Sequence, residues 1–68
     1  MKISYNKLWK LLIDKKMNKT ALTKATGLST STMSKLSRGE NVNTNILVKI
    51  CQYLDCDLGD IAEMSKED

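Results

Sequence analysis

Residues 19–38, KTALTKATGLSTSTMSKLSR, decide the fold of this 68-residue chain. Within them, Gly27 can adopt the positive φ angle that ends many helices, and Ser29 can cap the helix that follows. Apolar side chains flank this turn at helical spacing, so that each helix turns one side toward a core: Leu22, Ala25, Leu28, Met33 and Leu36. The stretch therefore predicts helices over 19–26 and 30–37 joined by a glycine turn.

The outward face of the second predicted helix carries small polar residues and one long cation: Thr30, Ser31, Ser34 and Lys35. Such a face fits the major groove of DNA, where hydroxyls and a lysine can bond to base edges. We expect base contacts from three residues, of which the first two stand at the helix start that enters deepest: Thr30, Ser31 and Lys35. Ser34 is as well placed for a phosphate as for a base.

This segment resembles the helix-turn-helix of the phage repressor and Cro family, also called the Xre family. The resemblance covers about residues 8–64 and rests on spacing: Leu22, Gly27, Met33 and Leu36, then Arg38-Gly39 and a matching helix over 44–54. It implies an all-α fold, a compact five-helix bundle of the lambda-repressor-like DNA-binding type with its helix-turn-helix in the second and third helices.

Two positions depart from that family's pattern. Thr23 stands where the family usually has alanine, which implies looser packing or a hydroxyl bonded to the preceding turn. Leu12 and Ser37 stand where many members have a buried Arg-Glu pair. An apolar substitute for a buried ion pair is often neutral or favourable for stability.

Phosphate contacts are expected around the same two helices. The helix over 19–26 has free N–H groups at its start that can bind a phosphate, and Lys19 and Thr20 add a charge and a hydroxyl there. The residues expected to contact phosphates carry polar or basic side chains near this pair of helices: Lys19, Thr20, Ser34, Arg38 and Asn41.

The remaining sequence predicts three more helices, over 5–16, 44–54 and 58–64, and its β-branched residues are too scattered for alternating strands. With Ser29, polar residues suited to cap helices precede four of the five: Asn18, Ser29, Asn43 and Asp57. Tyr5 and Trp9, four residues apart, are expected to pack rather than to stack on a base. The predicted core joins all five helices: Leu8, Leu12, Leu22, Ala25, Leu28, Met33, Leu36, Ile46, Leu47, Ile50, Leu54, Leu58 and Ile61.

The length allows one domain, residues 1–68, with an ordered core over about 3–64. The N-terminal apolar run is interrupted by Lys7 and Lys10 and lacks a small-residue cleavage site, so we expect the first helix of a cytoplasmic protein rather than a signal peptide. No window of the sequence reaches the eighteen apolar residues typical of a membrane span.

The two cysteines, Cys51 and Cys56, are expected to be small buried apolar residues. The chain has no histidine, and two cysteines alone provide neither a zinc site nor a disulfide framework. We therefore expect no metal site, no cofactor and no catalytic residues.

Charge is distributed unevenly along the chain. Residues 1–40 carry nine Lys or Arg against two acids, a net charge of +7, whereas residues 41–68 carry two Lys against six acids, a net charge of −4. The basic half contains the predicted helix pair and would attract a polyanion, while the acidic half would be held away from it or would face a partner.

The sequence favours a sequence-specific binder of double-stranded DNA, a repressor-like transcriptional regulator. The resemblance suggests a homodimer joined through the helices over 44–54 and 58–64. The alternative is an antitoxin-like or adaptor module that keeps the fold without specific DNA binding, in which case the acidic helices would be the working surface. An enzyme is the third class, and it fares worst because no group of residues suits catalysis.

Overall fold

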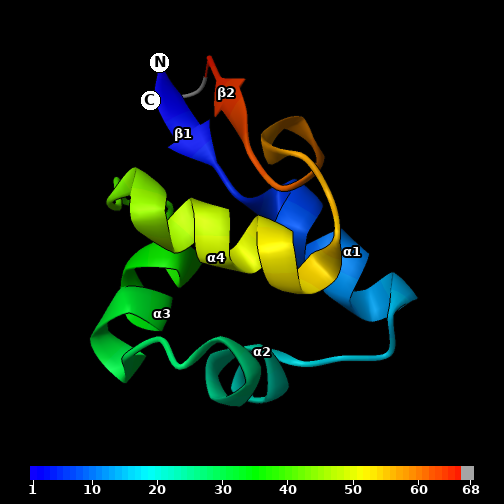
Figure 1. Ribbon diagram of the computed structural model, residues 1–68. Coiled ribbons are helices and arrows are strands. Elements are labelled where there is room, and N and C mark those ends of the chain that lie inside the picture. The colour runs from blue at the N-terminus through cyan, green and yellow to red at the C-terminus, as the bar shows by residue number, and fades with distance from the viewer. Residues whose placement is uncertain (67–68) are drawn as a thin grey trace.

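Four α-helices and a two-stranded sheet make up the part of the chain that the computed structural model describes, residues 1–66 (Figure 1). The elements follow in chain order: β1 (Lys2–Ser4), α1 (Asn6–Asp14), α2 (Lys19–Thr26), α3 (Thr30–Ser37), α4 (Thr44–Leu54), a 3₁₀ helix (Leu58–Asp60) and β2 (Glu63–Ser65). Within these residues, no helix is both long and apolar enough to cross a membrane.

The helix pair forms as the sequence predicts, because local signals fix both of its ends. The Asn18 side chain accepts a hydrogen bond from the Ala21 N–H at 2.7 Å, and Ser29 accepts from the Thr32 N–H at 3.2 Å. Gly27 ends α2 with a φ angle of 72°, a conformation that costs glycine little. The predicted bounds of α2, α3 and α4 are confirmed, and α1 is shorter at both ends than the predicted 5–16.

The C-terminal segment differs from the prediction, since the helix expected over 58–64 does not form. A single 3₁₀ turn, closed by reciprocal hydrogen bonds between Asp57 and Asp60, is followed by an extended strand. This strand, β2, pairs antiparallel with β1, with Ile3 opposite Met64. Backbone pairing across the fold thus overrides the local helical preference of the segment, which Gly59 already weakens. The expectation of an all-helical, five-helix bundle is therefore wrong in these two respects.

The core lies between the four helices and the start of the chain. Its buried side chains are Tyr5, Leu8, Leu12, Leu22, Met33, Leu36, Leu47, Ile50, Leu54 and Ile61. Four members of the predicted core are less buried than expected: Leu28 and Ile46 are half-buried, and Ala25 and Leu58 are exposed. Ala25 falls at the solvent edge of α2, and Leu58 lacks the α-helix that would have aligned it with Ile61.

Tyr5 packs as expected, and it is a member of the buried core, although the predicted core did not include it. It is 2% exposed, and its hydroxyl donates to the Glu40 carbonyl oxygen, just beyond α3, at 3.0 Å. A buried tyrosine needs such a partner for its hydroxyl. The bond ties the segment between β1 and α1 to the end of α3.

Candidate nucleic-acid interface

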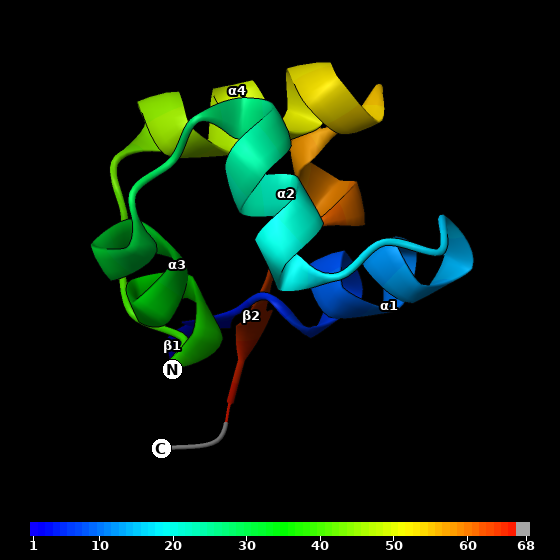
Figure 2. The same cartoon turned by 90° about the horizontal axis from the view of Figure 1, so that it is seen from below.

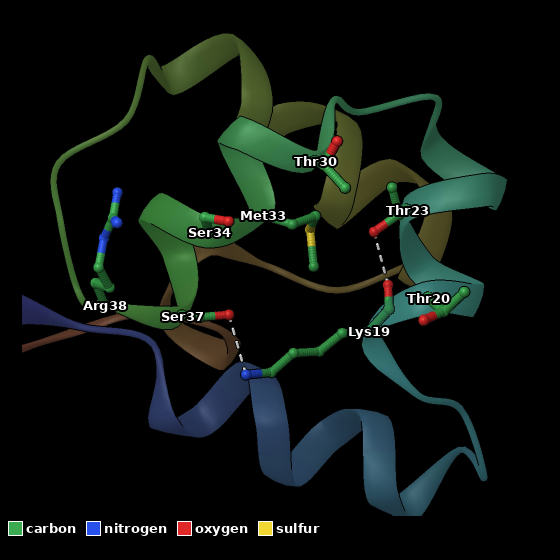
Figure 3. Close-up of a pocket in the computed structure, with 8 residues that line it drawn as sticks. All are labelled: Lys19, Thr20, Thr23, Thr30, Met33, Ser34, Ser37 and Arg38. Atoms are coloured by element: carbon green, nitrogen blue, oxygen red, sulfur yellow. Dashed lines mark hydrogen bonds between the residues drawn. The ribbon is translucent and has the colours of Figure 1, made fainter.

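Helices α2 and α3 enclose an open groove of about 380 Å³ (Figure 3). Side chains from both helices border it, namely Lys19, Thr20 and Thr23 from α2 and Thr30, Met33, Ser34 and Ser37 from α3, with Arg38 beyond the end of α3. Met33 is buried, so its thioether forms part of the groove floor between the two helices. Around this apolar floor the rim carries hydroxyls and two cations, a combination suited to a polyanionic backbone.

Lys19 connects three helices at one end of this groove. Its ammonium group lies 4.2 Å from the centroid of the Trp9 ring on α1 and donates to the Ser37 hydroxyl on α3 at 3.0 Å. A cation held over an aromatic face and by a hydrogen bond has fewer conformations than a free lysine. Because an ammonium has three N–H donors, two remain for another acceptor.

The two departures from the family pattern have clear structural outcomes. The Thr23 hydroxyl donates to the Lys19 carbonyl oxygen at 2.7 Å, which is the bond to the preceding turn that the sequence analysis offered as one alternative. Leu12 is buried, while Ser37 is exposed and bonds to Lys19. The contact between Lys19 and Ser37 joins α2 to α3 and was not foreseen, because it links two positions that are 18 residues apart.

A second hollow, of about 570 Å³, lies at the far end of α3, where Lys35, Gly39, Glu40 and Asn41 face the residues around β1. Arg38 and Glu40 form an ion pair between exposed side chains at this end of the helix. Exposed ion pairs contribute little to stability, so this one can exchange for a pair with a phosphate.

All eight residues that the sequence analysis assigned to DNA are exposed. The first groove brings together five of them: Lys19, Thr20, Thr30, Ser34 and Arg38. Lys35 and Asn41 border the second hollow instead, and Ser31 borders neither. The candidate surface therefore extends along α3 from its first turn to the loop that follows it.

The two cysteines lie away from this surface, at the end of α4. Both are half-buried rather than fully buried, and the Cys56 N–H donates to the Cys51 carbonyl oxygen at 3.0 Å. Burial, together with the neighbouring Cys51, raises the pKa of the Cys56 thiol to about 11. The thiol therefore stays protonated at neutral pH and is a poor nucleophile. Among residues 1–66, no three metal-ligating side chains come together.

Comparison with known proteins agrees with this geometry. The family model of the Cro/C1-type HTH DNA-binding domain matches residues 7–67. The chain is also similar to a solved crystal structure, that of the transcriptional regulator VanUg in its Form II, at 55% sequence identity and a TM-score of 0.94. The alignment covers 97% of this chain and 88% of that chain. No curated protein matches the sequence.

Proposed function

The chain belongs to the Cro/C1-type helix-turn-helix DNA-binding family, and from that membership we propose that it is a transcriptional regulator that reads double-stranded DNA with α3 in the major groove. One observation carries this proposal: α3 exposes a row of small hydroxyls and one lysine beside a groove with a cationic rim. Bound to an operator, such a protein acts by occupying the site. This is the repressor-like mode that the sequence also favours.

In the proposed complex, three residues of α3 contact base edges: Thr30, Ser31 and Lys35. Thr30 and Ser31 form the first turn of α3, the end that enters the groove in this class of motif. The exposure of both side chains supports their assignment.

The phosphates are held by residues on either side of α3: Lys19, Thr20, Ser34, Arg38 and Asn41. Asn18 uses its side-chain oxygen to cap the Ala21 N–H, so the other N–H groups at the start of α2 are available to an anion. Lys19 can reach the same anion with the donors that Ser37 does not use.

We further propose that two copies bind together, because one recognition helix covers only a few base pairs. The helix expected over 58–64 is absent, so the pairing surface is α4 with the 3₁₀ helix rather than two α-helices. Val48, Tyr53 and Leu58 expose apolar surface there, which a second copy can cover.

Arg38→Ala should weaken binding to every duplex alike and reduce the slope of log affinity against log salt by about 0.9, the value for one phosphate contact. Glu40→Gln is the matched variant, because it frees Arg38 from its ion pair and should strengthen binding. Gel retardation of duplexes selected from a random DNA pool measures both effects. If the pool yields no enriched motif and the unmodified chain retards no duplex, the adaptor alternative is favoured instead.

A further inference from the structure

β1 lies beside the C-terminal end of α3, although the two are more than thirty residues apart in sequence (Figure 2). Lys2 borders the hollow that Lys35 and Asn41 line, and it also borders a smaller hollow, of about 220 Å³, that Arg38 lines. Among the residues that line these hollows with Lys2, three are proposed DNA contacts: Lys35, Arg38 and Asn41. Lys2 was not among the residues that the sequence analysis assigned to DNA.

The backbone of β1 is held in place from two sides. Lys2 and Ser65 are partners in the pairing of β1 with β2, and directly after β1 the Tyr5 hydroxyl donates to the Glu40 carbonyl oxygen, just beyond α3, at 3.0 Å. A Cβ atom added at Gly39 would lie 3.5 Å from the Ile3 carbonyl oxygen, so β1 passes close to the turn that ends α3. Lys2 is therefore presented from an ordered strand and loses less conformational freedom on binding than a residue in a free arm.

The charges around Lys2 also favour an anion. Among residues 1–66, no acidic side chain pairs with Lys2, and Glu40, which borders the same hollow, is already paired with Arg38. Lys2, Lys35 and Arg38 thus leave an excess of positive charge at this end of α3. A lysine ammonium acts as a point charge, which can bind a single phosphate oxygen.

We propose that Lys2 is a further phosphate contact, which extends the DNA-binding surface from the end of α3 onto β1. This inference rests on the proposed DNA binding. It adds a contact to the DNA backbone beyond the predicted helix pair, and it gives the small sheet a role in binding as well as in folding.

Lys2→Gln tests the proposal, with Lys10→Gln as the matched control. Lys10 is also exposed and its loss changes the net charge equally, but it borders a different hollow, which it shares with Asp14, Asp55 and Asp60. Affinity for a selected duplex and for an unrelated duplex is measured from about 50 to about 200 mM salt. Over this range the ratio of the affinity of the unmodified chain to that of Lys2→Gln should fall about 3.5-fold, because the variant has lost one phosphate contact. Lys2→Arg should restore the original slope, and Lys10→Gln should leave it unchanged.

Three outcomes would overturn the inference. Equal slopes for Lys2→Gln, Lys10→Gln and the unmodified chain would show that Lys2 meets no phosphate, while the proposed function would stand. A Lys2→Gln variant with an altered sequence preference would place Lys2 on a base edge rather than on a phosphate. If the unmodified chain fails to bind any duplex, the proposed function fails and the inference falls with it.

Discussion

Replacing Leu22 by alanine should lower the free energy of unfolding by about 2 to 4 kcal/mol. Leu22 is 0% exposed and belongs to α2, which packs against both α3 and α4, so truncation removes apolar burial and leaves a cavity between helices. For a domain of this size that loss is a large share of the total stability. Thermal or urea unfolding followed by circular dichroism measures it.

Leu58→Ala is the matched control, because the sequence pattern placed both leucines in the core. Leu58 is 48% exposed on the 3₁₀ helix of the single chain, and in the absence of DNA, at a concentration where the chain is monomeric, its truncation should change the free energy of unfolding by no more than about 0.5 kcal/mol. Equal losses for the two variants would mean that the C-terminal segment packs as the predicted helix after all.

The second large effect concerns Lys35. Lys35→Ala should cost about 1 to 3 kcal/mol of binding free energy at one base-pair position and relax the preference there, because a lysine that reaches guanine O6 or N7 discriminates against other bases. Binding to unrelated DNA should change little. Affinities for selected duplexes that carry each single substitution measure the effect.

The symmetry of the site tests the dimer in the same experiment. Two copies of α3 about one helical turn apart, near 34 Å, require an inverted repeat in the selected DNA, and Lys35→Ala should relax the same position in both halves. The proposal that two copies bind together would be contradicted if the selected DNA held a single half-site and ultracentrifugation showed one chain on the duplex.

Local signals were enough to predict the helix pair and α4. Asn18, Ser29 and Asn43 each have a short polar side chain that accepts from an N–H of the following helix, and such caps are readable from sequence. Gly27 likewise marks the end of α2 because few other residues adopt its φ angle without strain.

Contacts distant in sequence could not be predicted in this way. Residues 63–65 lack strong strand signals, and their pairing with β1 depends on where the fold places the N-terminus. The bond from Tyr5 to Glu40 and the bond from Lys19 to Ser37 depend equally on the tertiary arrangement. For the candidate site, the sequence identified exposed residues on α3, but it did not indicate that Lys2 lines the same hollow as Lys35 and Asn41, because that proximity depends on the tertiary fold.

In the proposed complex, α3 and the residues beside it form the DNA-binding surface. The most direct test is a titration of isotope-labelled protein with a selected duplex, followed through the backbone amide signals in NMR spectra. We expect the largest changes at the start of α2, along the exposed face of α3 and at Arg38 to Asn41, and smaller changes at those residues of α4 that do not contact a second copy. Changes concentrated on α4 and the 3₁₀ helix, with α3 unaffected, would contradict this assignment of the DNA-binding surface.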